Sequence, residues 1–180
     1  MSAKSKNYLH LAFLCFKGLI MKEIKLTTNI KVYASPQEMS TADRELLEQA
    51  HLAVRDSYSP YSNFKVGAAL RLKNGEILRG SNQENASYPL CLCAERTALG
   101  AAASLHPTSP VTVMAVTAKS PVKTIDRPIS PCGACRQVLC ETEMKFETDM
   151  RIIMQGEEGE IYEFATAKDL LPLSFGAEFL

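Results

Sequence analysis

Three cysteines and one glutamate have the residue types and the spacing from which a metal centre can be built. Cys93 stands alone, whereas Cys132 and Cys135 form a Cys-x-x-Cys pair directly after Pro131. Because a closed structural zinc site usually has four ligands, three thiolates predict a site with one open position. Glu95 is a poor ligand beside thiolates, but it is well suited to moving protons at a metal-bound water. The pattern therefore favours a hydrolytic metal centre.

Arg96 follows this glutamate, and its positive charge can offset the negative charge of the thiolates. Three thiolates leave zinc with a net negative charge, which opposes the acidification of a bound water. An arginine at this position is expected to donate hydrogen bonds to the thiolates and to withdraw some of that charge. The alternative is a surface arginine on a helix. Cys91 and Cys140 could supply the fourth ligand of a purely structural zinc site, but we interpret both as buried small apolar residues.

Both cysteine segments are expected at the starts of helices, where unpaired amides and the helix dipole favour thiolates and lower thiol pKa values. Cys132 and Cys135 would then lie on one side of a first helical turn. Cys93 can meet them only if the two helices begin side by side. The predicted metal centre therefore requires that these two helices pack with their amino-terminal ends next to each other.

Periodicity and turn residues predict the elements that position these segments. They are a short strand within 24–34, a helix from Ser40 or Thr41 to the Ser59-Pro60 break, a hairpin around Asn74-Gly75, a helix over 93–105, a strand over 111–117 covered on both faces, a helix over 132–141, strands over 151–154 and 161–164, and a helical turn over 167–171. This order predicts an α/β fold with a mixed central sheet and helices in α/β/α layering.

Two details of these elements predict packing. The small residues Gly67, Ala68 and Ala69 indicate a strand crowded by a helix or a ligand. The first long helix is amphipathic, and its polar positions are expected to face water. These positions are Asp43, Arg44, Glu45 and Glu48.

The bulk composition excludes several classes of protein. The chain has 180 residues, 46% of them hydrophobic and 22% charged, as in one soluble globular domain. Its 20 basic and 20 acidic residues include no basic run, so a nucleic-acid partner is not expected. No apolar run is long enough to span a membrane. Six cysteines without a convincing export signal favour metal ligation in a reducing compartment, which predicts a cytoplasmic protein.

The first twenty residues differ from the remainder of the chain. Residues 8–16 are apolar apart from His10 and resemble a weak signal peptide, but no small-x-small cleavage site follows them. We expect residues 1–20 to be an N-terminal extension that is either not translated, with Met21 as the functional start, or a disordered or partly helical tail. Residues 21–180 would form the functional domain.

Four segments together resemble the zinc deaminase signature, in which Cys-x-Glu is followed by Pro-Cys-x-x-Cys. They are residues 60–70 (PYSNFKVGAAL), 82–88 (NQENASY), 93–98 (CAERTA) and 130–137 (SPCGACRQ). More narrowly, residues 42–175 are similar to cytidine deaminases of the small, homotetrameric type. The resemblance implies the three-layer α/β/α fold of that family.

The resemblance also implies a reaction. Cys93, Cys132 and Cys135 would hold one zinc ion per subunit. Glu95 would take a proton from the attacking water and deliver protons to the cytosine ring and to the departing amino group. Cytidine and 2′-deoxycytidine would yield uridine and 2′-deoxyuridine plus ammonia, a reaction of pyrimidine salvage. The enzyme would be a homotetramer whose partner is a small-molecule nucleoside.

Binding residues follow from the same resemblance. Asn82 and Glu84 would hydrogen-bond the ribose hydroxyls, although on the residues alone the run 82–85 is more typical of turn and capping chemistry. Phe64 would line the base and sugar pocket. Backbone groups around Ala94 and Ser130 would contact the edge of the base. A carboxyl-terminal aromatic from a neighbouring subunit would complete the pocket: Phe175 is the expected residue and Phe179 the alternative.

Other functions use similar residues. A related deaminase could act on a cytosine-containing antibiotic such as blasticidin S. Nucleotide and polynucleotide deaminases share the metal site, but they require cationic contacts to phosphate, which the slightly acidic residues 21–180 do not favour. A catalytically inactive zinc-binding module would have no need of Glu95.

Overall fold

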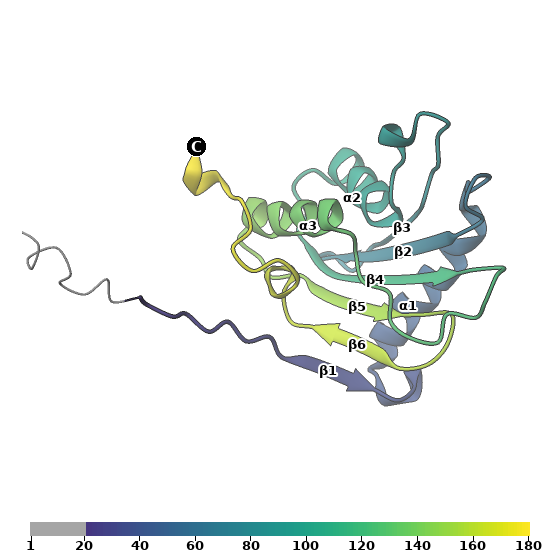
Figure 1. Ribbon diagram of the computed structural model, residues 1–180, viewed down its shortest axis with the longest axis horizontal. Coiled ribbons are helices and arrows are strands. Elements are labelled where there is room, and N and C mark those ends of the chain that lie inside the picture. The colour runs from purple at the N-terminus through teal and green to yellow at the C-terminus, as the bar shows by residue number, and fades with distance from the viewer. Residues whose placement is uncertain (1–20) are drawn as a thin grey trace, which may run out of the picture.

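A mixed six-stranded sheet forms the centre of the computed structural model, which describes residues 21–180 (Figure 1). Its strands are β1 (Ile30–Tyr33), β2 (Lys65–Leu72), β3 (Ile77–Ser81), β4 (Val111–Lys119), β5 (Arg151–Gln155) and β6 (Ile161–Phe164). Their order across the sheet is β1-β6-β5-β4-β2-β3. Only the neighbours β4 and β5 are parallel. The predictions for residues 1–20 lie outside the described residues.

Three helices cover the two faces of this sheet. The helix α1 (Thr41–Ala53) lies on one face, and α2 (Ala94–Leu105) and α3 (Gly133–Phe146) lie on the other (Figure 1). The predicted α/β/α layering is confirmed. Several boundaries differ from the expected ones. The helix α1 ends at Ala53 and is followed by a 3₁₀ turn at Val54–Asp56, so it does not reach the Ser59-Pro60 break. In addition, β1 includes only the second half of 24–34, β4 extends to Lys119, α3 extends to Phe146, and 167–170 is a 3₁₀ helix.

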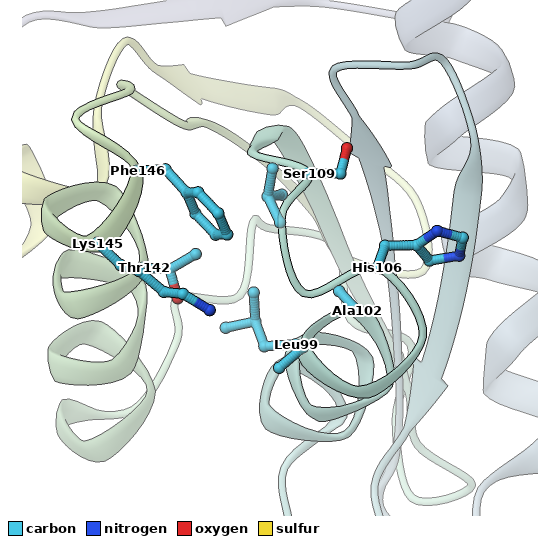
Figure 2. Close-up of a pocket in the computed structure, with 9 residues that line it drawn as sticks. Leu99, Ala102, His106, Ser109, Thr142, Lys145 and Phe146 are labelled. Atoms are coloured by element: carbon cyan, nitrogen blue, oxygen red, sulfur yellow. The ribbon is translucent and has the colours of Figure 1, made fainter.

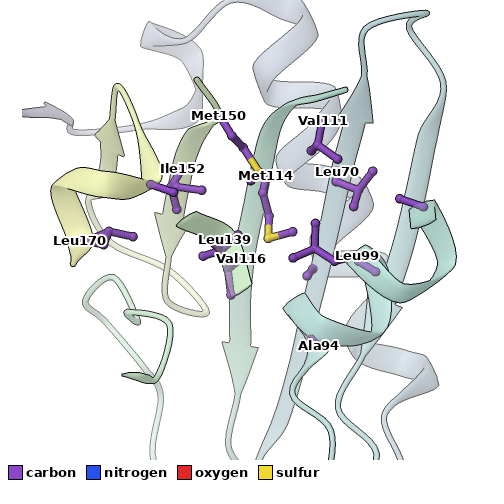
Figure 3. Close-up of a cluster of buried hydrophobic side chains, with 14 of the residues drawn as sticks. Leu70, Ala94, Leu99, Val111, Met114, Val116, Leu139, Met150, Ile152 and Leu170 are labelled. Carbon is purple, nitrogen blue, oxygen red and sulfur yellow. The ribbon is translucent and has the colours of Figure 1, made fainter. Parts of the chain in front are cut away.

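The strand β4 contributes buried side chains to the hydrophobic core on both faces of the sheet. Met114 and Val116 are buried in the cluster beneath α2 and α3, which Figure 3 shows. Val113 and Ala115 are buried in a second cluster against α1. This alternation follows from the two-residue period of a strand, because successive side chains point to opposite faces. The prediction of a strand covered on both faces is confirmed.

The hairpin and its crowding also agree with the sequence. Asn74-Gly75 joins β2 to β3, and Gly75 has a φ of 90°, which glycine adopts without strain. A Cβ at Gly67 would clash with the backbone oxygen of Ala50 and would lie 2.7 Å from the backbone nitrogen of Val54. The neighbour that crowds β2 is therefore α1.

Glycine also allows a helix to lie close to the sheet on the face that α2 and α3 cover. A Cβ at Gly80 on β3 would clash with the backbone of Ala94 and of Ala98 in the first turns of α2. The missing side chain thus lets α2 lie directly on β3. This contact fixes where α2 begins, immediately after Cys93.

One prediction about α1 is wrong. Asp43 does not face water: it is 8% exposed and accepts a hydrogen bond of 2.6 Å from Nη2 of Arg151 on β5. Burial alone would raise the pKa of Asp43, but hydrogen bonds from Arg151 and Ser40 outweigh it and hold the pKa below its ordinary value. Helical periodicity could not reveal this because Arg151 lies more than a hundred residues further along the chain.

No helix within residues 21–180 combines the length and the apolar composition needed to cross a membrane.

A pair of glycine substitutions tests the contact between α2 and β3. Gly80→Ala should lower the free energy of unfolding by about 1–3 kcal/mol because backbone atoms of α2 must move. Gly100→Ala is the matched control: no atom lies within 4 Å of a Cβ at this exposed position of α2, so helix stability should rise by about 1 kcal/mol. Urea unfolding measures both. An unchanged midpoint for Gly80→Ala would contradict the close contact.

Candidate active site

The three predicted cysteine ligands meet at the starts of α2 and α3. The sulfur of Cys132 lies 3.7 Å from that of Cys93 and 3.5 Å from that of Cys135, and all three sulfurs lie within 4.8 Å of one another. Cys93 and Cys132 are the N-cap residues of their helices. The prediction that the two helices begin side by side is confirmed.

These distances fit zinc. With Zn–S bonds of about 2.3 Å in tetrahedral geometry, two sulfurs on one ion lie about 3.8 Å apart. The observed separations are close to this value and far longer than the roughly 2.05 Å of a disulfide. Cys135 is fully buried, whereas Cys132 is exposed. The cluster is therefore open on one side, as a site that must admit a reactant requires.

The thiols do not all ionise with equal ease. Hydrogen bonds from Cys135, Arg96 and Cys132 lower the pKa of Cys93 in spite of its partial burial. The hydrogen bond to Cys93, burial and the charge of Glu95 raise the pKa of Cys135. The pKa of Cys93 is thus lowered, as expected, but by neighbouring side chains and not by the helix start. For Cys135 the expectation is wrong, because one thiolate opposes the next. A divalent cation among the sulfurs would remove this opposition.

Glu95 lies beside the cluster in the first turn of α2 and is 3% exposed. Burial raises the pKa of its carboxyl group, and the charge of Cys93 raises it further. A buried carboxyl group that holds its proton more firmly than in water is suited to accept a proton and to return it. This is the chemistry expected of it from the sequence.

Arg96 points toward the sulfur cluster. Its Nη2 donates to the backbone oxygen of Cys91 at 2.8 Å and lies 4.0 Å from the sulfur of Cys93. Its Nε is buried and has no hydrogen-bond partner among residues 21–180. The guanidinium charge therefore faces the thiols, as the sequence predicted, and not the solvent.

The two remaining candidate cysteines differ from each other. Cys140 is fully buried in the core, as predicted. Cys91 is not buried: its sulfur accepts a hydrogen bond from the backbone nitrogen of Asn85 at 3.2 Å, and it lines the cleft beside the cluster. The turn at 88–90 directs it there, which the sequence did not indicate. Within the described part of the chain, neither joins the sulfur cluster.

A cleft of about 380 Å³ opens above the cluster, within the range of sites for small molecules. It brings together most of the predicted site residues with several others that the sequence did not single out. The lining residues are Ser62, Phe64, Val66, Asn82, Gln83, Glu84, Cys91, Leu92, Cys93, Glu95, Ile129, Ser130 and Cys132. Val66, Leu92 and Ile129 were missed because apolar residues beside a motif look the same as core residues.

Four predicted site residues lie outside this lining. Cys135 and Arg96 belong to the sulfur cluster and its surroundings, whereas Ala94 and Phe175 were expected to contact the ligand. Ala94 is fully buried, and its backbone packs on Gly80, so only backbone groups at the helix start could reach a ligand. Phe175 is 58% exposed, stacks on Phe179 with 5.6 Å between ring centroids, and does not line the cleft of its own chain.

Asn82 is held by its neighbours. Its Oδ1 accepts hydrogen bonds from the hydroxyl of Ser57 at 2.6 Å and the backbone nitrogen of Val66 at 2.8 Å. Its Nδ2 donates to the backbone oxygen of Phe64 at 2.9 Å. Both acceptor positions of the amide oxygen are thus used, and one N–H of the amide remains for a ligand.

Glu84 closes the turn opposite Asn82. Its carboxylate accepts hydrogen bonds from the backbone nitrogen of Tyr61 at 2.8 Å and from the backbone nitrogen and hydroxyl of Ser62. The turn and capping chemistry that the residues alone suggested is therefore present. It does not exclude ligand binding, since the same side chain lines the cleft.

A second hollow is too small to be the reaction site. It lies between the carboxyl ends of α2 and α3, where Figure 2 shows Leu99, His106, Lys145 and Phe146 around it, and its volume is about 60 Å³. None of the predicted site residues lines it. The cleft at the sulfur cluster is the better candidate by size and by chemistry.

An α/β/α fold that holds three thiols and a buried carboxyl group at the mouth of a cleft defines a metal-dependent hydrolytic enzyme. Comparison with known proteins gives the particular family. The model of the cytidine and deoxycytidylate deaminase zinc-binding region matches residues 40–147, so the chain belongs to this family of zinc-binding deaminases.

Individual relatives agree with this membership. The chain is 44% identical to a cytidine deaminase of Halalkalibacterium halodurans over 76% of its length and 96% of the relative. It resembles the crystal structure of cytidine deaminase from Burkholderia pseudomallei with a TM-score of 0.65 and 40% identity, over 76% of this chain and 100% of that one. A blasticidin-S deaminase of Bacillus cereus is 30% identical over 76% of this chain and 94% of the relative.

Replacing one sulfur tests the metal centre. Cys132→Ser should lower zinc affinity at least tenfold, because one of three soft ligands is lost, while the wild type should hold about one zinc per chain. Cys91→Ser is the matched control in the same cleft and should retain the metal. Zinc content after dialysis against a chelator measures both. Equal loss from the two variants would indicate a four-cysteine structural site instead.

Proposed function

We propose that this chain hydrolyses cytidine and 2′-deoxycytidine to uridine and 2′-deoxyuridine, releasing ammonia. The observation that carries the proposal is the cleft itself, where Glu95 lies buried beside the sulfur cluster and Asn82 and Glu84 line the same space. Glu95 and the sulfur cluster are suited to the hydrolytic chemistry, and Asn82 and Glu84 are suited to binding a sugar. Relatives named cytidine deaminase support this assignment.

Cys93, Cys132 and Cys135 would hold the zinc ion. When bound, zinc supplies a Lewis acid that makes water a nucleophile near neutral pH. Glu95 takes one proton from the attacking water and gives it to N3 of the cytosine ring. It then takes the second proton from the new hydroxyl group on C4 and passes it to the amino group, which leaves as ammonia while the C4 carbonyl forms. One water is consumed and one ammonia is released. The guanidinium of Arg96 offsets part of the thiolate charge beside this reaction.

The opposite end of the cleft suits a sugar. The free N–H of Asn82 donates to a hydroxyl oxygen, and the carboxylate of Glu84 accepts from a hydroxyl hydrogen. Phe64 supplies an apolar wall for the base and the sugar. The carboxylate of Glu84 among the lining residues would repel a phosphate, which favours a nucleoside over a nucleotide.

A second candidate substrate is blasticidin S, because a deaminase of that antibiotic is among the relatives. Asn82 and Glu84 favour cytidine moderately over it, since both suit sugar hydroxyls. The two substrates share the cytosine ring, so the metal centre does not discriminate between them. A direct comparison of their deamination rates would show which of them the enzyme prefers.

The assembly belongs to the proposal as well. We infer a homotetramer in which Phe175 completes the cleft of a neighbouring subunit. The exposure of this ring and its absence from the cleft of its own chain favour the arrangement. We further propose that residues 21–180 form the deaminase domain, that the protein is cytoplasmic and that its reaction belongs to pyrimidine salvage.

Loss of the Glu95 carboxylate tests the mechanism. The purified wild-type protein should deaminate cytidine and 2′-deoxycytidine but not their monophosphates. The loss of cytidine absorbance measures the rate. Glu95→Gln should reduce kcat about 10²–10⁴-fold because the amide cannot move protons, while the zinc content stays unchanged. Glu48→Gln, the same change at an exposed position of α1, should have no effect.

Two outcomes of this assay count against the proposal. Full activity of Glu95→Gln would refute the role of the carboxylate. Faster turnover of blasticidin S than of cytidine would refute the nucleoside as the substrate.

Removal of the Phe175 ring tests the shared cleft. Phe175→Ala should raise KM for cytidine about tenfold, and Phe179→Ala should raise it less. Mixing Phe175→Ala chains with Glu95→Gln chains should restore activity, because some clefts then combine an intact Glu95 with an intact ring from a neighbour. A fully active monomer in light scattering would contradict a cleft shared between subunits.

A further inference from the structure

Arg136 makes an unusual set of hydrogen bonds at the edge of the cleft. It follows Cys135 in α3, and three of its nitrogens donate to oxygens of two segments. Nη2 donates to the hydroxyl of Ser130 at 2.7 Å, Nε to the backbone oxygen of Pro131 at 2.9 Å, and Nη1 to the backbone oxygen of Leu170 at 2.9 Å. One side chain thus joins the metal-binding helix to two loops.

The acceptors of Arg136 are uncharged. Within residues 21–180, no carboxylate lies within 4.0 Å of its guanidinium. Hydrogen bonds from an ionised donor are stronger than neutral ones, and the planar fork of arginine fixes their directions. The charge therefore serves to hold these oxygens in place and not to form an ion pair.

Ser130 is the acceptor that reaches the substrate end of the site. It lines the cleft and lies two residues before Cys132. Because its oxygen accepts from Arg136, the hydroxyl hydrogen is left to donate elsewhere. The open space of the cleft is where a ligand acceptor would meet it.

Leu170 is the acceptor that leads to the carboxyl-terminal segment. It ends the 3₁₀ helix η4 (Ala167–Leu170), and the chain then continues to Phe175. Gln137, the neighbour of Arg136, donates from Nε2 to the backbone oxygen of Phe175 at 2.8 Å. Two consecutive residues of α3 therefore fasten this segment to the helix that starts at Cys132.

We propose that Arg136 is a positioning residue for the nucleoside: it orients the Ser130 hydroxyl to donate into the cleft and ties that loop to the carboxyl-terminal segment. The proposal rests on the proposed function, since it assigns a nucleoside to the cleft. It adds Ser130 as a side-chain contact to the ligand. Arg136 acts through Ser130 and does not touch the substrate itself.

The experiment compares Arg136→Lys, Ser130→Ala and the double variant. Lysine keeps the charge but cannot serve three divergent acceptors. Each single change should raise KM for cytidine and the dissociation constant of the product uridine about tenfold, while kcat changes less than about threefold. If Arg136 acts through Ser130, the double variant should be no worse than either single variant. Ser130→Thr keeps the hydroxyl and should stay near wild type.

Controls separate positioning from folding. Zinc content should match the wild type in all of these variants, and each variant should remain folded at the temperature of the assay. Arg79→Lys, the same change at an exposed position of β3, should alter no parameter. Calorimetric binding of uridine is measured without turnover, so it reports on the cleft even if the catalytic proposal is wrong.

Three results would overturn the inference. They are additive effects in the double variant, an unchanged uridine affinity in Ser130→Ala, and a loss of zinc in Arg136→Lys that parallels the loss of activity. If the wild type itself binds no uridine and converts no cytidine, the proposed function fails first. The two failures are therefore distinguishable.

Discussion

The convergence of two helix starts is the constraint on which the site depends. Cys93 and Cys132 occupy N-cap positions, so the sulfur cluster exists only where α2 and α3 begin next to each other. Gly80 sets the first of these positions because it lets the backbone of α2 rest on β3. The metal centre is thus placed by backbone contacts of the fold, and the sulfurs need little freedom of their own.

Around this cluster the protein has to balance charge. One thiol ionises readily, another is opposed by its neighbours, and a buried carboxyl group lies next to both. Arg96 is the cation directed at this group of acids, and the unpaired Nε shows that its position is set by the site more than by its own hydrogen bonds. A divalent cation completes the balance, which links occupancy of the site to its ionisation.

Sequence patterns predicted those parts of the structure that depend on neighbours along the chain. Helix starts, the Asn74-Gly75 hairpin and the buried strand β4 depend on local periodicity and turn chemistry, and they were found close to the expected bounds. The side chain of Asp43 was misjudged because its partner is on β5. Cys91 was misjudged because a 3₁₀ turn directs it into the cleft. Distant partners decide such cases, and a single sequence does not show them.

Glu84 has a consequence for how the enzyme can be studied and altered. Its carboxylate closes the turn that carries Tyr61 and Ser62, and it also faces the space assigned to the sugar. Any replacement therefore changes the order of a loop and the chemistry of a contact at once, so its effect on affinity cannot be assigned to the contact alone. For the same reason, a redesign toward another sugar would have to start from the loop and treat the carboxylate as part of its architecture.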